Sequence, residues 1–380
     1  MSIYLDHNAT TAPDPEVVDA VAWAMAQTWG NPSTLCGQGR EARAALDTAR
    51  ARVAALVGAG DPSEIVFTSG GTESDHLALT GSCGAGRGDH VVTSMAEHKA
   101  VLRTCAQLEQ RGLRVTYLPV DGLGRVDPDA VRKAITPKTA LVSVMLASNE
   151  VGSINPLPEI AAICRERRVL LHSDAVQAPG RTAVDVTALG VDLLSISGHK
   201  LHGPRGVGAL WLRKGTVLQA VLAGGSQERG MRPGTENVPG AHGLGVAAEL
   251  ARKRLGETPA RVRSLRDRLW ELIRAAVPEA RAHGDRERGL CNVLNVSFPG
   301  HDAEELVLSL DKEGIEVGTG SACTTGQTTP SHVLLAMGIP PQEARSSVRF
   351  SLGGGNTASE IDEVAAVVAR LVGSRSTCHS

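Results

Sequence analysis

Along the first 255 residues, apolar positions alternate between helical spacing and short continuous runs. Apolar residues three and four apart predict helices beginning near residue 15 and covering 46–57, 100–110, 159–167 and 241–255. Asp14 and Pro15 suit the cap and first-turn positions of the first helix. Short apolar runs predict strands at 65–68, 91–94, 115–120, 141–146, 169–172 and 193–197. Such strands are buried on both faces, so the pattern predicts an α/β fold with a mostly parallel sheet covered by helices.

The pattern changes after residue 240, where a long helix leads outward and a second follows at 262–273. Beyond it, strands at 293–298, 315–317 and 348–352 alternate with helices near 303–310 and 359–372. This pattern predicts a smaller α+β unit at the C-terminal end. We therefore expect a large domain over 15–256 and a small domain formed by 1–14 and 257–380.

Composition narrows the class of protein. Hydrophobic residues make up 42% and charged residues 21%, which is typical of a soluble globular protein. The net charge of −2 offers no electrostatic reason to expect direct binding of nucleic acid or of a membrane surface. No apolar run approaches the roughly 20 residues of a membrane helix, and the N-terminus lacks an export signal, so we expect a cytoplasmic protein. The seven cysteines contain no close CxxC pair, so we expect free thiols and no metal site.

Ligands of open α/β sheets gather beyond the carboxyl ends of the strands. After the strand at 65–68, Gly70 and Gly71 precede Thr72 and a helix, so backbone N–H groups there can approach an anion such as a phosphate. The same residues are also typical of an ordinary glycine turn with a threonine cap. The segment alone does not decide between these two interpretations.

Two charged residues follow other strands. Asp174 comes after the strand at 169–172, where a buried carboxylate needs a cation such as a protonated heteroaromatic nitrogen; a helix cap is the alternative. Lys200 follows the strand at 193–197 in a loop rich in Gly and Pro, where partial desolvation would lower its pKa and make it a Schiff-base nucleophile; a solvated lysine is the alternative. Together, an anion cup, an acid and an amine are the groups that pyridoxal phosphate requires.

The chain also resembles the cysteine desulfurases, especially the nitrogen-fixation type. The matching blocks occur in order along nearly the whole chain: 4–11 (YLDHNATT), 30–33 (GNPS), 96–98 (AEH), 149–152 (NEVG), 197–200 (SGHK), 232–237 (RPGTEN), 320–324 (GSACT) and 349–352 (RFSL). The resemblance implies the aspartate-aminotransferase-like fold, known as pyridoxal-phosphate fold type I. It also implies a homodimer with each active site at the subunit interface.

The resemblance assigns roles to residues of these blocks. It implies that Lys200 holds pyridoxal 5'-phosphate, that Asp174 keeps the pyridine nitrogen protonated, and that His98 stacks on the ring. It further implies that Gln177 hydrogen-bonds the phenolic oxygen. The implied phosphate ligands are Gly71 through its backbone N–H, Thr72, Ser197, His199, and Thr235 of the neighbouring subunit. The implied ligands of the substrate carboxylate are Asn149 and Arg349.

The implied reaction converts L-cysteine to L-alanine, with Lys200 moving the Cα proton and Cys323 accepting the sulfur as a persulfide. Cys323 lies among small and polar residues at 318–327, which predicts a segment able to carry the thiol between the cofactor and an acceptor. A positive neighbourhood or a base such as His98 must favour its thiolate. The implied partner is a scaffold or sulfurtransferase protein, serving iron–sulfur cluster biosynthesis or modification of cofactors or nucleic acids. The alternatives are a selenocysteine lyase, an aminotransferase, or an inactive partner protein of the same fold.

Overall fold

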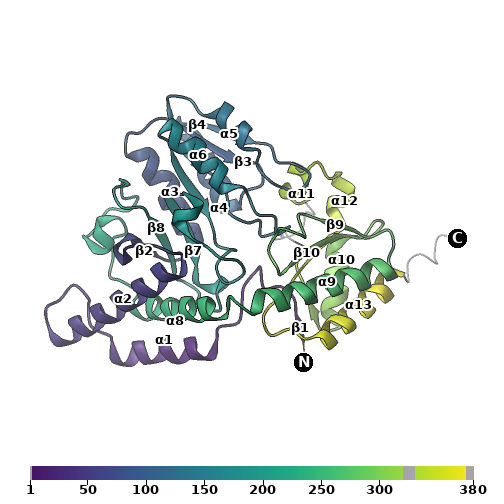
Figure 1. Ribbon diagram of the computed structural model, residues 1–380. Helices are drawn as coiled ribbons and strands as arrows, with labels where there is room; N and C mark the ends of the chain where they lie inside the picture. The colour runs from purple at the N-terminus through teal and green to yellow at the C-terminus, as the bar shows by residue number, and fades with distance from the viewer. Residues whose placement is uncertain (1, 320–329, 374–380) are drawn as a thin grey trace.

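The computed structural model describes residues 2–319 and 330–373 (Figure 1). The larger part is built on a seven-stranded sheet with the order β2-β8-β7-β6-β5-β3-β4. Neighbouring strands are parallel except at β8, which is antiparallel to both β2 and β7, so the predicted mostly parallel sheet is confirmed. The strands are β2 (Ile65–Thr68), β3 (His90–Ser94), β4 (Arg114–Leu118), β5 (Thr139–Ser143), β6 (Leu170–Asp174), β7 (Leu193–Ser197) and β8 (Gly208–Leu212).

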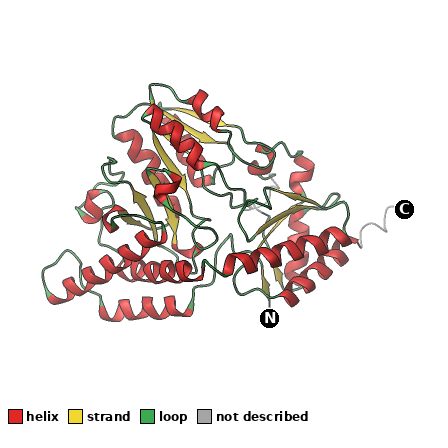
Figure 2. Ribbon diagram, in the orientation of Figure 1, coloured by secondary structure: helices red, strands yellow, loops and turns green. Residues whose placement is uncertain are grey.

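Helices cover both faces of this sheet (Figure 2). Consecutive strand residues point to opposite faces: Val91 packs in one hydrophobic cluster with helices α3 and α4, and Val92 packs in another with α2, α6 and α8. Burial on both faces explains why these strands read as continuous apolar runs. The helices of this part are α1 (Pro15–Gln27), α2 (Gly37–Leu56), α3 (Gly71–Gly84), α4 (Lys99–Gln110), α5 (Pro128–Ala134), α6 (Leu157–Arg167), α7 (Val186–Leu189) and α8 (Val238–Arg254). Asp14 caps α1 as predicted.

The smaller part has its own hydrophobic cluster. It contains a three-stranded antiparallel sheet of order β12-β10-β9, and a two-stranded sheet in which β1 pairs with β11 in parallel. The N-terminal strand therefore joins the C-terminal residues, and the break between α8 and α9 carries the chain across (Figure 1). The elements are β1 (Ile3–Tyr4), α9 (Thr258–Ala276), β9 (Arg281–His283), β10 (Val293–Ser297), α10 (Ala303–Lys312), β11 (Ile315–Glu316), α11 (His332–Ala336), α12 (Pro341–Arg345), β12 (Ser347–Ser351) and α13 (Ala358–Gly373).

The expected domain boundaries stay a prediction. The structure also contains elements that the expected ranges do not cover, namely the strands β1, β8 and β9 and the helices α5, α7, α11 and α12. Helix α2 begins at Gly37, earlier than the expected start at residue 46. Within residues 2–319 and 330–373, no helix is long and apolar enough to span a bilayer.

A buried ion pair fastens the glycine-rich loop between β8 and α8. Glu228 binds Arg50 of α2 through both carboxylate oxygens, at 2.7 and 2.8 Å, and accepts the backbone N–H of Phe67 on β2. Its side chain is 2% exposed. Glu228 and Arg229 both have positive φ angles, 45° and 58°, which residues with a Cβ rarely adopt. The ion pair therefore holds a strained backbone in place, because that conformation has little intrinsic stability.

Replacing Glu228 with glutamine should destabilise the protein by about 3 kcal/mol, because Arg50 would keep a buried charge without its counter-ion. The free energy of unfolding in urea measures this loss. The matched control is Asp47→Asn, which removes an exposed i,i+4 pair with Arg43 and should cost less than about 1 kcal/mol. Equal losses in the two variants would show that the Glu228 pair does not stabilise the loop.

Candidate active site

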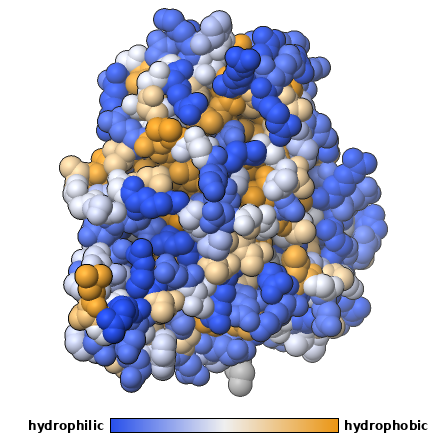
Figure 3. Space-filling model, turned by 60° about the vertical axis from the view of Figure 1, so that its left-hand side comes forward, coloured by the Kyte–Doolittle hydropathy of each residue, from blue (hydrophilic) through white to orange (hydrophobic). Residues whose placement is uncertain are grey.

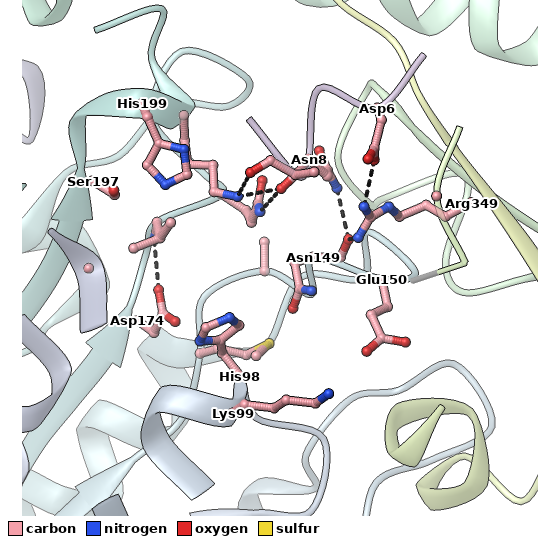
Figure 4. A pocket seen from close by; sticks show the side chains of 18 of the residues that line it. Asp6, Asn8, His98, Lys99, Asn149, Glu150, Asp174, Ser197, His199 and Arg349 are labelled. Carbon is pink, nitrogen blue, oxygen red and sulfur yellow. Dashed lines mark hydrogen bonds and ion pairs between the residues drawn. The ribbon is translucent and has the colours of Figure 1, made fainter. Parts of the chain in front are cut away.

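A cavity of about 570 Å³ lies at the carboxyl ends of the parallel strands, between the larger and smaller parts. Its volume is typical of small-molecule sites. In Figure 4, Asp174, Ser197 and His199 lie on one side of this cavity, and Arg349 and Asp6 lie on the other. The other expected site residues that line it are Gly71, Thr72, His98, Asn149, Gln177 and Lys200.

Asp174 is the last residue of β6 and is 7% exposed. It accepts the backbone N–H of Val176 at 2.8 Å. No helix begins here, so the alternative of a helix cap is wrong. Burial raises the pKa of Asp174, whereas the nearby charges of His98 and Lys200 act to lower it. A further cation at this carboxylate would favour its ionised form.

Lys200 ends a single helical turn that follows β7. Its Nζ donates hydrogen bonds to the backbone carbonyl oxygens of Asn8 and, at 2.7 Å, Ala9. Burial lowers the pKa of Lys200 to about 7, and the positive charges of Arg181 and Arg349 add to this effect. A substantial fraction of the amine is therefore neutral near pH 7, which is the form that attacks an aldehyde.

The start of α3 forms a recess beside the cavity, lined by Gly71, Thr72, Ser197 and His199. The first amide N–H groups of a helix have no acceptor within the helix and favour an anion. Gly71 is needed here, because a Cβ at this position would lie 2.6 Å from Val176. The recess thus offers backbone and side-chain donors to a phosphate. Thr235 is exposed and does not line this recess of its own chain.

His98 and Gln177 lie on the wall near Lys200. His98 is the N-cap of α4, and its Nδ1 accepts the backbone N–H of Ala100. The cavity walls lower the pKa of His98 by desolvation, although its ring remains open to the cavity. Gln177 donates from Nε2 to the carbonyl oxygen of Asn8 and accepts from Arg181.

Arg349, on β12, is 5% exposed and is held by two groups. Its Nη2 lies 2.6 Å from Oδ1 of Asp6, and its Nη1 donates to the carbonyl oxygen of Asn149 at 3.1 Å. Its Nε is buried and has no hydrogen-bond partner among the described residues. A guanidinium that lines a cavity is suited to bind a carboxylate there.

Sequence reasoning did not single out Asp6 and Asp75, which also line the cavity. Asp6 lies in the 4–11 block, so its position in that block was the available signal. Asp75 had no comparable signal. It is 1% exposed, and a carboxylate oxygen of Asp75, one of Asp174 and a ring nitrogen of His98 lie within 4.8 Å of one another. Burial and the charge of Asp174 raise the pKa of Asp75, which favours a neutral acid over a metal ligand.

Cys323 lies within 320–329, outside the described residues, so its predicted role stays a prediction. The described residues on both sides of this segment line the cavity, namely Gly318 and Thr319 before it and His332 after it.

Comparison with known proteins gives full-length matches. The model of the family aminotransferase class-V matches residues 3–364. A cysteine desulfurase of Gluconacetobacter diazotrophicus is 46% identical over 374 residues, which cover 98% of this chain and 93% of that protein. A solved NifS-like protein matches with a TM-score of 0.92 and 36% identity, over 98% of this chain and 100% of that one. The structure described as SspA in complex with cysteine matches with a TM-score of 0.80 and 33% identity, over 94% and 100%.

Proposed function

Because the chain belongs to the class-V aminotransferase family, and within it to the cysteine desulfurases, we propose that it removes sulfur from L-cysteine and releases L-alanine. One observation carries this proposal. A single cavity brings together an amine of lowered pKa, a buried carboxylate, a helix N-terminus and a buried guanidinium. These are the groups that a pyridoxal-phosphate enzyme acting on an amino acid needs.

The residues of the cavity fit pyridoxal 5'-phosphate. The recess at α3 would hold its phosphate, Asp174 its ring nitrogen, and Lys200 its aldehyde carbon, while His98 would stack on the ring and Gln177 would bind the phenolic oxygen. When bound, the cofactor supplies an electron sink for negative charge at the substrate Cα. Asp174 supports this chemistry by staying ionised beside a cation.

The chain's own groups then perform the remaining tasks. Arg349 and Asn149 bind the substrate α-carboxylate and so place Cα in the cavity. Lys200, which lines the same cavity, takes and returns the Cα proton. Cysteine as the amino acid is supported by the relative SspA, whose structure is described as a complex with cysteine.

Cys323 is the proposed sulfur acceptor. Its thiolate attacks the substrate sulfur and forms an S–S bond. The Cβ–S bond breaks with its electron pair going to the carbon fragment, and Cβ then takes up a proton to become the methyl group of L-alanine. The sulfur remains as a persulfide on Cys323. An acceptor protein then takes this sulfur. The described residues 318, 319 and 332, which precede and follow the segment that contains Cys323, line the cavity, and this supports the proposal.

We propose a homodimer as the functional assembly. The large apolar side chains on α1 and in the residues that follow it that are at least half exposed are Val18, Trp23, Met25, Trp29 and Leu35. Figure 3 views the side that is on the left in Figure 1 and shows apolar side chains exposed among polar ones. Exposed apolar patches often mark protein interfaces. Thr235 does not line the recess of its own chain, so in a dimer its side chain is available to the same recess of the neighbouring subunit.

The free thiols fit the proposed cytoplasmic location. Cys36, Cys83, Cys105, Cys164 and Cys291 are all unpaired, as a reducing compartment favours. The destination of the sulfur among iron–sulfur clusters, cofactors and nucleic acids depends on the acceptor protein.

The decisive test supplies the cofactor-loaded protein with L-cysteine and a reductant. We expect L-alanine and sulfide to appear in equal amounts. Pyruvate and ammonia in place of alanine would contradict the proposal, and activity confined to selenocysteine would favour a selenocysteine lyase.

The pKa of Lys200 gives a prediction for cofactor capture. Deprotonated amine is the reactive form, so the capture rate of the cofactor-free protein should rise through about pH 7 and level off above it. Stopped-flow absorbance across a pH series measures this. The control is Nα-acetyl-lysine in solution, whose rate should keep rising toward its higher pKa. A protein midpoint as high as that of the control would contradict a desolvated Lys200.

A further inference from the structure

Asp6 holds the arginine that we assign to the substrate carboxylate. Its Oδ1 lies 2.6 Å from Nη2 of Arg349, and both side chains line the cavity (Figure 4). The two residues are 343 positions apart, so the fold brings them together across the whole chain. The position that a bound carboxylate would occupy is thus already next to a carboxylate of the protein.

The remaining donors of Arg349 show what an incoming carboxylate meets. A planar guanidinium binds a carboxylate through two adjacent donors, either Nε with Nη2 or Nη1 with Nη2. Both pairs include Nη2, which Asp6 engages. The second pair also includes Nη1, which donates to the Asn149 carbonyl, whereas Nε has no partner among the described residues. Either mode of bidentate binding must therefore share Nη2 with Asp6 or displace it.

Asp6 is fixed in this position. Its backbone pairs with Ser351 of β12, and its carbonyl oxygen accepts the hydroxyl of Tyr4 at 3.0 Å. Gly318 also packs closely against this pair of side chains. A Cβ built at Gly318 would lie 3.0 Å from both Oδ1 of Asp6 and Nη2 of Arg349. The carboxylate of Asp6 cannot simply rotate toward Gly318 when a second carboxylate arrives.

Resting on the proposed function, we propose that Asp6 competes with the α-carboxylate of the amino acid for Arg349 and so sets its affinity. In the empty site Asp6 balances a buried cation, which would otherwise be costly. In the occupied site it places a like charge beside the ligand, which weakens binding. Substrate and product share this carboxylate, so the competition promotes release of L-alanine after each turnover.

The alternative is that Asp6 only attaches the N-terminal segment to β12. That role predicts that loss of the charge disorders Arg349 and weakens carboxylate binding. The competing role predicts the opposite sign. The Asp6→Asn variant distinguishes the structural role from the competing role, because asparagine retains the size of the side chain and an oxygen acceptor while removing the charge.

The experiment titrates L-alanine into cofactor-loaded wild type and Asp6→Asn, followed by the change in cofactor absorbance. We expect the dissociation constant to fall at least about fivefold in Asp6→Asn. L-alaninamide has no carboxylate, so its affinity should stay unchanged. The matched control is Asp14→Asn, which removes an equally short pair with Arg254 outside this cavity, at 2.6 Å, and should leave alanine affinity unchanged.

An unchanged or larger dissociation constant for L-alanine in Asp6→Asn would overturn the proposal. If that variant does not fold, Asp6→Ser provides the same comparison with a smaller uncharged side chain. Failure of the proposed function would look different, because wild type would then form no alanine and sulfide from L-cysteine. The alanine titration measures binding alone, so the two failures are distinguishable.

Discussion

Replacing Lys200 with alanine is expected to lower alanine formation from L-cysteine by about 10⁴-fold or more, because proton transfer by a positioned side chain contributes up to about 10⁴. The same amine also attaches the cofactor in our proposal, so its loss removes two functions at once. The variant should still fold, because Lys200 lines the cavity and its side chain is not part of the hydrophobic clusters of the described residues.

Covalent attachment can be measured separately from activity. Borohydride reduction of the cofactor-loaded wild type should fix the cofactor to Lys200, as peptide mass spectrometry would show. The matched control is Lys99→Ala, which removes another lysine of the same cavity and should leave the label on Lys200. A label that persists in Lys200→Ala, or that moves to Lys99 in wild type, would contradict the assignment.

Replacing Cys323 with alanine is expected to lower sulfide release by at least about 10³-fold while leaving cofactor binding intact. The nucleophile that breaks the Cβ–S bond would be missing, and groups that act as a unit lose most of their effect when one is removed. Cofactor absorbance should be that of wild type, because the proposed cofactor ligands among the described residues are all retained. Loss of sulfide release with an unchanged cofactor spectrum would therefore place the defect in the sulfur-transfer step and not in cofactor binding.

The matched control is Cys36→Ala, which removes an exposed thiol on the surface and should keep the wild-type rate. In wild type without reductant, mass spectrometry should find one added sulfur atom on the peptide that contains Cys323. Full sulfide release by Cys323→Ala would contradict the persulfide mechanism. Added sulfur on Cys36 in place of Cys323 would identify the exposed Cys36 as the sulfur acceptor.

The central sheet was predictable because its strands are buried on both faces. Val91 and Val92 contact different helices, so consecutive residues must both be apolar, and such runs are visible in a sequence. Strand direction is not visible in this way. The run at β8 resembles its neighbours in composition, yet β8 is antiparallel to β7.

Candidate site residues were predictable where the site lies directly after a strand. Asp174 and Lys200 follow β6 and β7 closely, so their order along the chain places them at one edge of the sheet. The importance of Asp6 depends on a contact with Arg349, and no local pattern reports a pairing across 343 residues. Asp75 was missed for a similar reason, because its burial arises from the packing of α3 against the sheet.

The pairing of β1 with β11 and of Asp6 with Arg349 has a consequence for biosynthesis. Residues 6–9 leave the ribosome long before Arg349 and Ser351, whose side chains are partners of Asp6 and Asn8. A nascent polypeptide therefore cannot complete the amino-acid pocket until residues 349–351 have been synthesised. Prematurely terminated products, even those with the entire central sheet, would lack a working carboxylate clamp.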